Sequence, residues 1–287
     1  MNMKEKITDL IRNRSTNLPT LPVVINNIIV CARSNRSSAA ELGRYISNDQ
    51  ALVSRILKIA NSPYYGSPKR IDSITRAIIV VGFKEIISIA LGSGVFSVLS
   101  KKSTKTSIDM NQLWMHSIGV GFAAKNIELY IGRQTDESTM LTGLLHDIGK
   151  IVFFVYFPEE YSKVLEAEDI NTGPLHLVEK KVLGLDHAEM ASLIMKHWNF
   201  PDIISIPISY HHEHESCPRD HLDMCMIINA ANYICHISEI GHSGNQSTEK
   251  TEEAFSALGL NNEDIGSLVE NLKSEQEEIE GFLQALR

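Results

Sequence analysis

The run Leu144–Lys150 (LLHDIGK) sets a histidine beside an aspartate at the end of an apolar helical pattern. An imidazole nitrogen and a carboxylate oxygen suit divalent ions such as Zn, Fe, Mn, Co or Mg. Such a pair is common by chance, but further histidines lie at intervals of 24 to 40 residues along the chain: His116, His187, and the adjacent His211 and His212. Each interval lets one helix leave a site and another return. The spacing therefore predicts a metal-centred site built by several helices.

Apolar residues recur at helical spacing along most of the chain, and strand patterns are nearly absent. Ser38 with Glu41 and then Asp49 predict helix starts, and Asn61-Ser62-Pro63 predicts a stop. The fold class predicted from these signals is all-α.

Two polar stretches, Lys101–Asp109 and Gly241–Glu252, divide the chain into three predicted parts. Residues 1–107 form an N-terminal helical subdomain. Residues 108–242 form the subdomain that holds the metal site. Residues 243–287 form a linker and an acidic helix over Glu263–Leu283.

Composition restricts the function classes. A net charge of −8 and a pI near 5.8 argue against binding to nucleic acid, which needs a basic surface. The four cysteines show no CxxC spacing and indicate reduced, packed thiols in a cytoplasmic protein. No signal peptide is predicted, and the apolar stretch Ile86–Ser100 is too short to span a membrane, so no membrane association is expected.

Each histidine also has a plainer interpretation. His116 lies inside a long predicted helix, where a half-buried histidine with one hydrogen bond is the alternative to a ligand. His187 follows Asp186 at a predicted helix start and is either metal-facing or on the surface. In the cluster after Tyr210, we expect His214 to be an exposed bystander. Structural or surface roles are expected for the remaining histidines: His176, His197, His221, His236 and His242.

Asp147 is predicted to end a helix that Gly149 breaks. The negative end of the helix dipole disfavours a carboxylate there, and a metal cation would compensate it. Lys150 is expected at the rim of the site, where it meets an anionic substrate group such as phosphate. The alternative for Lys150 is a partner of the helix dipole.

The pattern of His116, His146-Asp147, His187 and His211-His212 resembles the HD superfamily of metal-dependent phosphohydrolases. The His146–Lys150 run (HDIGK) also resembles that of HD-GYP phosphodiesterases. Four further motifs resemble the HDOD domain, the HD-related output domain of bacterial signalling proteins: Leu18–Pro22 (LPTLP), Ile46–Leu52 (ISNDQAL), Ile56–Pro63 (ILKIANSP) and Ala77–Gly82 (AIIVVG). The resemblance covers about residues 10–240 and implies an HD-domain-like helical bundle with an N-terminal helical subdomain.

The resemblance implies a set of metal ligands: His116, His146, Asp147, His187, His211, His212 and, on the last core helix, Asn232. It also implies Asp147 and Lys150 as catalytic residues. The superfamily has aspartate where this chain has Asn232, and a neutral amide removes one negative charge from the site. No Gly-Tyr-Pro element follows His211-His212.

Two functions follow from the resemblance. The first is a regulatory or protein-interaction module in bacterial signal transduction, with a partly retained site for one or two divalent ions or for none, and with an unidentified signalling protein as partner. The second is an active metal-dependent phosphohydrolase, a phosphodiesterase or phosphatase acting on a nucleotide or cyclic dinucleotide. In either case we expect the site to bind a phosphorylated small molecule.

Overall fold

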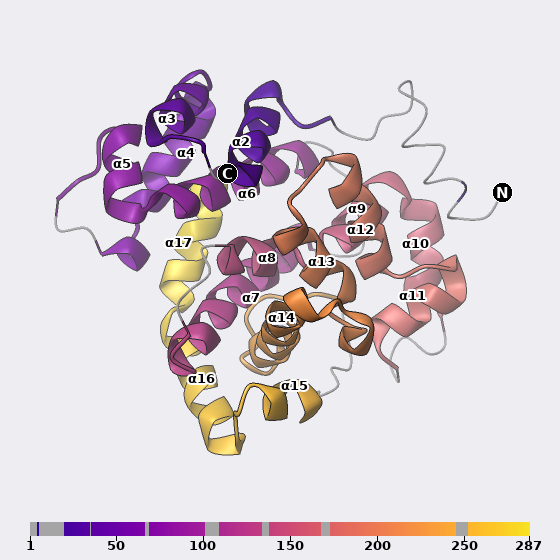
Figure 1. Ribbon diagram of the computed structural model, residues 1–287. Helices are drawn as coiled ribbons and strands as arrows, with labels where there is room; N and C mark the ends of the chain where they lie inside the picture. Colours follow the sequence, from indigo (N-terminus) through magenta and orange to yellow (C-terminus); the bar gives the residue numbers. More distant parts are fainter. Residues whose placement is uncertain are drawn as a thin grey trace.

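The computed structural model describes Glu5 and residues 20–34, 36–66, 69–100, 109–133, 138–167, 173–244 and 252–287. Within these ranges every regular element is a helix, which confirms the all-α prediction (Figure 1). The predicted hinge at 101–108, most of the linker after Gly244 and the LP of the first HDOD motif lie outside the described residues.

Five helices and one short 3-10 turn form the N-terminal bundle, in the indigo to purple part of Figure 1. In chain order they are α2 (Val23–Arg33), α3 (Ala39–Ser47), α4 (Gln50–Ala60), η1 (Pro63–Tyr65), α5 (Ile74–Val81) and α6 (Phe83–Leu99). The predicted caps are confirmed: Ser38 accepts from the Glu41 N–H at 3.1 Å and Asp49 from the Leu52 N–H at 3.0 Å.

The second part is built around the long helix α7 (Met110–Tyr130), which packs against α8 and α14. The other helices that follow α7 in this part are α8 (Thr139–Leu145), α9 (Ile148–Tyr156), α10 (Pro158–Leu165), α11 (Leu175–Leu183), α12 (His187–His197), α13 (Asp202–Tyr210), η3 (His214–Ser216) and α14 (Arg219–Ile237). Gly121 and Gly143 let α7 and α8 approach closely, because a Cβ on Gly143 would lie 2.6 Å from the Gly121 Cα.

The C-terminal part differs from the prediction of one acidic helix over Glu263–Leu283. The structure has α15 (Glu252–Ala257), α16 (Asn262–Ser274) and α17 (Gln276–Leu286), with a break at Glu275. The side chain of Asn126 on α7 donates to Glu275 Oε2 at 2.7 Å, so a contact distant in sequence holds this break. Helix α17 then lies between the two larger parts and contacts α4, α6 and α7 (Figure 1).

Two apolar segments have the length and composition of membrane spans. One is Thr139–Tyr156, and 94% of it is buried inside the protein. The other combines α5 and α6, which meet at a bend of 118° at Gly82. Because the first segment is buried and the second is sharply bent, both have the features of core helices in a packed helical protein.

Helix α6 joins the N-terminal bundle to the rest of the protein. It is buried along most of its length and packs against α2 and α4 on one side and against α8 and α9 on the other. One continuous apolar core therefore runs from Ile25 in α2 to Phe282 in α17.

Deleting residues 1–107 should give an insoluble or molten fragment, because it removes α6 and exposes the apolar surface of α8 to water. We expect the fragment 108–287 to lack a cooperative thermal transition and near-UV circular dichroism. A soluble fragment that unfolds cooperatively would show that the second part is stable without the N-terminal bundle.

Candidate metal centre

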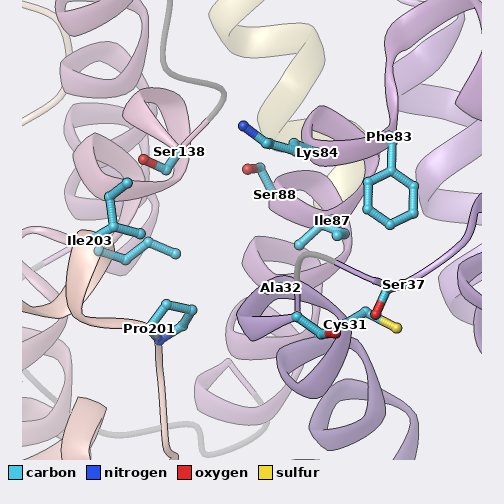
Figure 2. A pocket seen from close by; sticks show the side chains of 12 residues that line it. Cys31, Ala32, Ser37, Phe83, Lys84, Ile87, Ser88, Ser138, Pro201 and Ile203 are labelled. Carbon is cyan, nitrogen blue, oxygen red and sulfur yellow. The ribbon is translucent and has the colours of Figure 1, made fainter.

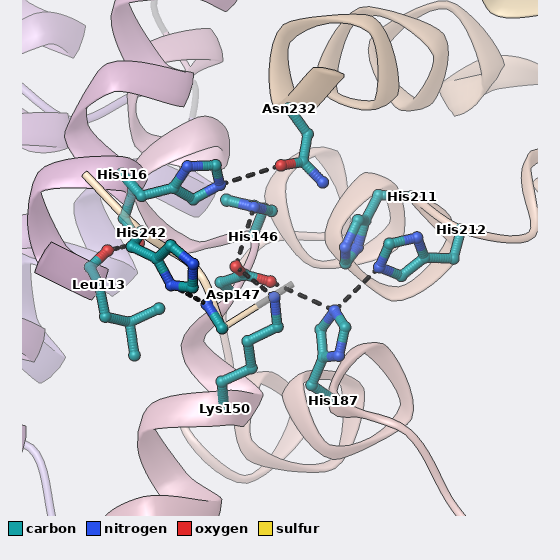
Figure 3. A network of polar contacts seen from close by, with 12 residues as sticks. Leu113, His116, His146, Asp147, Lys150, His187, His211, His212, Asn232 and His242 are labelled. Carbon is teal, nitrogen blue, oxygen red and sulfur yellow. Dashed lines mark hydrogen bonds and ion pairs between the residues drawn. The ribbon is translucent and has the colours of Figure 1, made fainter. Parts of the chain in front are cut away.

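The structure brings together the side chains of seven residues predicted as ligands, from five different helical segments (Figure 3). His116 comes from α7, His146 and Asp147 from the corner between α8 and α9, His187 from the start of α12, His211 and His212 from the end of α13, and Asn232 from α14. Apart from the partly buried His212, these side chains are buried in the helix packing.

The corner at His146-Asp147 differs from the predicted helix end. Helix α8 ends at Leu145, and α9 begins immediately afterwards at Ile148, with Gly149 in its first turn. The prediction that Gly149 breaks the helix was therefore wrong. A Cβ at Gly149 would lie 1.9 Å from the carbonyl oxygen of His187, so only glycine allows α9 to pack against the start of α12.

The candidate ligand atoms form two neighbouring groups. His116, His146 and Asp147 form one, and His187, His211 and His212 form the other. Within each group the atoms lie within 4.8 Å of one another. The Oδ1 atom of Asp147 is 3.2 Å from His187 Nε2, so the carboxylate lies between the two groups. Each group has the size and donor types of a site for one divalent ion.

Three of the histidines are held in the same tautomer. Nδ1 of His146 donates to the carbonyl of Gly143 at 2.8 Å, and Nδ1 of His211 donates to that of Ile208 at 2.7 Å. Nδ1 of His187 donates to the Glu179 carboxylate at 2.6 Å. In a neutral imidazole this arrangement leaves the lone pair on Nε2, the atom that points into the site.

The inward-facing atoms lack ordinary hydrogen-bond partners. His146 Nε2, Asp147 Oδ1 and His211 Nε2 are buried without one. His187 Nε2 and His212 Nε2 face each other at 2.9 Å, a distance at which only one of the two nitrogens can carry a proton. A cation would satisfy all of these atoms together, so the residues present fit a divalent ion.

The Asp147 carboxylate is the electrostatic centre of the site. Burial alone would raise its pKa, but the electrostatic influence of the adjacent His146 ring and of the Lys150 ammonium holds the pKa of Asp147 well below its usual range. Lys150 is fully buried, and its Nζ donates to Asp147 Oδ2 at 2.8 Å. The prediction that Lys150 stands at the rim was wrong, because this ion pair draws the ammonium group inside.

His116 is held differently from the other histidines. Its Nε2 donates to Asn232 Oδ1 at 2.9 Å, so the atom that would bind a metal carries the proton instead. Burial and the nearby His146 lower the pKa of His116 to about 3, so its ring is neutral. Asn232 faces the His146-Asp147 group as expected, and Asn229 donates instead to the His211 carbonyl.

Sequence reasoning missed three residues around the site. Glu179 on α11 accepts from both the backbone N–H and Nδ1 of His187, and Tyr161 donates to its other oxygen at 2.5 Å. His176, which we had assigned to a structural or surface role, stacks on His212 with ring centroids 4.1 Å apart. The only signal for these residues was the spacing of His176 and Glu179, which places both on one face of a helix.

His214 was also placed wrongly. We had expected an exposed side chain, but His214 is buried and its Nε2 pairs with Glu253 of α15 at 2.9 Å. It contributes to the packing of the C-terminal part and lies outside the two ligand groups.

Comparison with known proteins identifies the family. The family model of the HDOD domain matches residues 18–214. The chain belongs to the HDOD family. An uncharacterized protein from Treponema pallidum (strain Nichols) is 26% identical over 228 residues, which make up 79% of this chain and 44% of that protein. This HDOD chain therefore spans less than half the length of that relative.

Solved structures share the fold over nearly the whole chain. An HDOD protein of unknown function from Geobacter sulfurreducens is 23% identical, with a TM-score of 0.81 over 99% of this chain and 97% of that one. A protein from Shewanella amazonensis SB2B, provisionally named a phosphohydrolase, is 19% identical, with a TM-score of 0.76 over 99% of this chain and 98% of that one. A protein from Marinobacter aquaeolei VT8, provisionally named a signal transduction protein, is 20% identical, with a TM-score of 0.75 over 99% of this chain and 65% of that one. At these identities the likeness shows the fold alone.

Replacing Glu179 with Gln should weaken binding of Co²⁺ or Zn²⁺ about tenfold, since carboxylates behind a histidine ligand orient it and raise its basicity. Calorimetry on protein freed of metal measures the change. The matched control is Glu159→Gln, which makes the same substitution at an exposed position of α10. Equal affinities for the two variants would show that Glu179 supports only the packing of α11.

Proposed function

We propose that this HDOD chain is a regulatory module of bacterial signal transduction in which the histidine site holds one divalent ion as part of the structure. The observation that carries the proposal is the burial of the site together with the Lys150–Asp147 pair. The ammonium group occupies one oxygen of the only carboxylate in the two ligand groups. A substrate would have to displace packed helices to reach that carboxylate.

Charge balance favours one ion over two. Asp147 supplies the only negative charge among the residues of the two groups, and Lys150 offsets it. Glu179 adds one further carboxylate behind His187. Two divalent ions would add four positive charges to this buried region, where uncompensated charge is costly. The three histidines of the second group with Asp147 Oδ1 form the better site, because His116 is engaged by Asn232.

The proposed function also includes a partner that carries the signal to this module. The name of the Marinobacter aquaeolei neighbour supports a role in signalling. We propose a signalling protein as the partner, and the input would reach the module through that protein or through a small ligand.

Metal analysis of protein purified without chelator tests this function. We expect about one divalent ion per chain and no hydrolysis of bis(p-nitrophenyl) phosphate or of cyclic dinucleotides. Thermal unfolding with and without chelator should show that the ion stabilises the protein. A chain that binds no divalent ion, or that turns over these substrates, would contradict the proposal.

Replacing Asn232 with Asp should raise metal occupancy towards two ions per chain. The new carboxylate adds a negative charge beside His116 and supplies an anionic oxygen, which binds a divalent ion better than an amide oxygen does. The readouts are metal content by mass spectrometry and phosphatase activity. Asn271→Asp, which adds the same charge at an exposed position of α16, is the control. Unchanged metal content in Asn232→Asp would show that the amide is not what limits the first group.

A second candidate function is a metal-dependent phosphohydrolase. The position of Asp147 between the two histidine groups favours it, and so do the provisional names of two Shewanella amazonensis neighbours. Divalent ions held there would polarise a phosphoryl group as Lewis acids. In this function Asp147 and Lys150 are the proposed catalytic residues.

The second candidate requires the site to bind phosphate or a phosphorylated small molecule. With metal present, calorimetry with phosphate, nucleotides and cyclic dinucleotides should then show binding that is lost in Lys150→Ala and His146→Ala. His242→Ala, at an exposed position, should leave the affinity unchanged. Absence of binding for all three ligands would exclude this candidate and leave the regulatory function.

A further inference from the structure

A cavity of about 480 Å³ lies where the N-terminal bundle meets the second part of the protein (Figure 2). Helices α2 and α6 form one wall. Ser138, which precedes α8, and the start of α13 form the other. The cavity lies at the opposite end of α13 from His211, about 13 Å away along that helix, so it is separate from the histidine site.

The lining combines apolar side chains with hydroxyl groups. The apolar side chains of the lining include Phe83, Ile87, Ile203 and Ile204. Ile203 is 43% exposed, whereas the next residue, Ile204, is buried. Hydroxyl groups of four serines complete the wall: Ser34, Ser37, Ser88 and Ser138. A cavity that combines apolar surface with a few polar groups is typical of small-molecule sites, whose volumes are roughly 300–1,000 Å³.

Among the described residues that line this cavity, Lys84 is the one charged side chain. It extends from the first turn of α6 across the opening towards Ser138 (Figure 2). It forms no ion pair with any described residue, whereas the neighbouring Glu85 is buried and paired with Lys125. In a chain of net charge −8, an unpaired ammonium beside an apolar surface attracts a single negative charge.

We propose that this cavity binds a small amphipathic organic anion. The apolar body of the ligand lies against Ile87, Ile203 and Ile204, and its carboxylate or sulfonate meets the Lys84 ammonium at the opening. A nucleotide or another polyanion fits less well, because the described part of the lining supplies only one cation. The proposal does not depend on a metal at the histidine site.

The test uses decanoate as the anion and decanol as the uncharged probe of the same chain length. Each displaces the fluorescent anion anilinonaphthalene sulfonate from the folded, full-length protein. We expect decanoate to bind more tightly than decanol. Lys84→Ala should weaken decanoate about fivefold, as expected for an ion pair at a protein surface, and leave decanol unchanged.

Ile203→Ser should weaken both probes about tenfold, because it removes apolar surface that either chain would cover. Two controls make the same changes at exposed positions that are outside the cavity lining: Lys273→Ala on α16 and Ile79→Ser on α5. Both should bind as the unaltered protein does. Thermal unfolding of all four variants checks that each is folded.

Three results would overturn the proposal. The first is no displacement by decanoate at concentrations below its own micelle formation. The second is equal binding of decanoate and decanol, which would exclude recognition of the charge. The third is equal binding by Ile203→Ser and Ile79→Ser, which would place the probes elsewhere on the protein.

Discussion

The buried carboxylate of Asp147 is the constraint on which the centre of this protein depends. An ionised carboxylate inside a protein costs several kcal/mol unless charged or hydrogen-bonding groups surround it. The Lys150 ammonium donates to Oδ2 of Asp147 at 2.8 Å, and Nε2 of His187 and of His146 lies 3.2 Å and 3.3 Å from the carboxylate. These groups come from α9, α12 and the corner before α9, so the surroundings of the carboxylate depend on how these elements pack. Gly149 makes that arrangement sterically possible, because it lets the backbone of α9 approach the His187 carbonyl.

The same arrangement explains why the site is suited to holding an ion more than to processing a substrate. The backbone carbonyls of Gly143 and Ile208 and the Glu179 carboxylate fix three imidazoles with Nε2 directed inwards. Such pre-orientation favours metal binding, since little conformational freedom is lost when the ion enters. Lys150 and Asn232 act in the other direction. Lys150 neutralises the carboxylate of Asp147, and Asn232 accepts the hydrogen bond of His116 Nε2. Both contacts reduce the positive charge of bound ions that the site can balance.

The sequence predicted what depends on local chemistry. Caps such as Ser38 and Asp49 compete directly with the backbone for hydrogen bonds, and so the helix starts were found. The HDIGK run and the later histidines predicted which residues meet. The burial of Lys150, the role of Glu179 and the break at Glu275 were missed, because each depends on contacts between distant helices. Glu275, for example, is held by Asn126, which lies 149 residues earlier in the chain. No local pattern distinguishes such a glutamate from one on a solvated helix face.

The cavity and the histidine site share two helices, and this bears on how a module of this kind can receive a signal. Ser138 in the cavity wall immediately precedes α8 and His146 immediately follows it, and in the same way Pro201 in the cavity wall precedes α13 and His211 follows it. A ligand that contacts both walls of the cavity stabilises the packing of the N-terminal bundle against the starts of α8 and α13. The size of this stabilisation depends on the ligand concentration relative to the Kd of the ligand. A bound molecule shifts an equilibrium only between states that it binds unequally. The cavity ligand therefore affects the histidine site only if separation of the N-terminal bundle from α8 and α13 also moves the helix ends that carry His146 and His211. The close packing of α8 against α7 at Gly143 resists such movement of α8, and the contacts of α13 with α8, α12 and α14 resist that of α13.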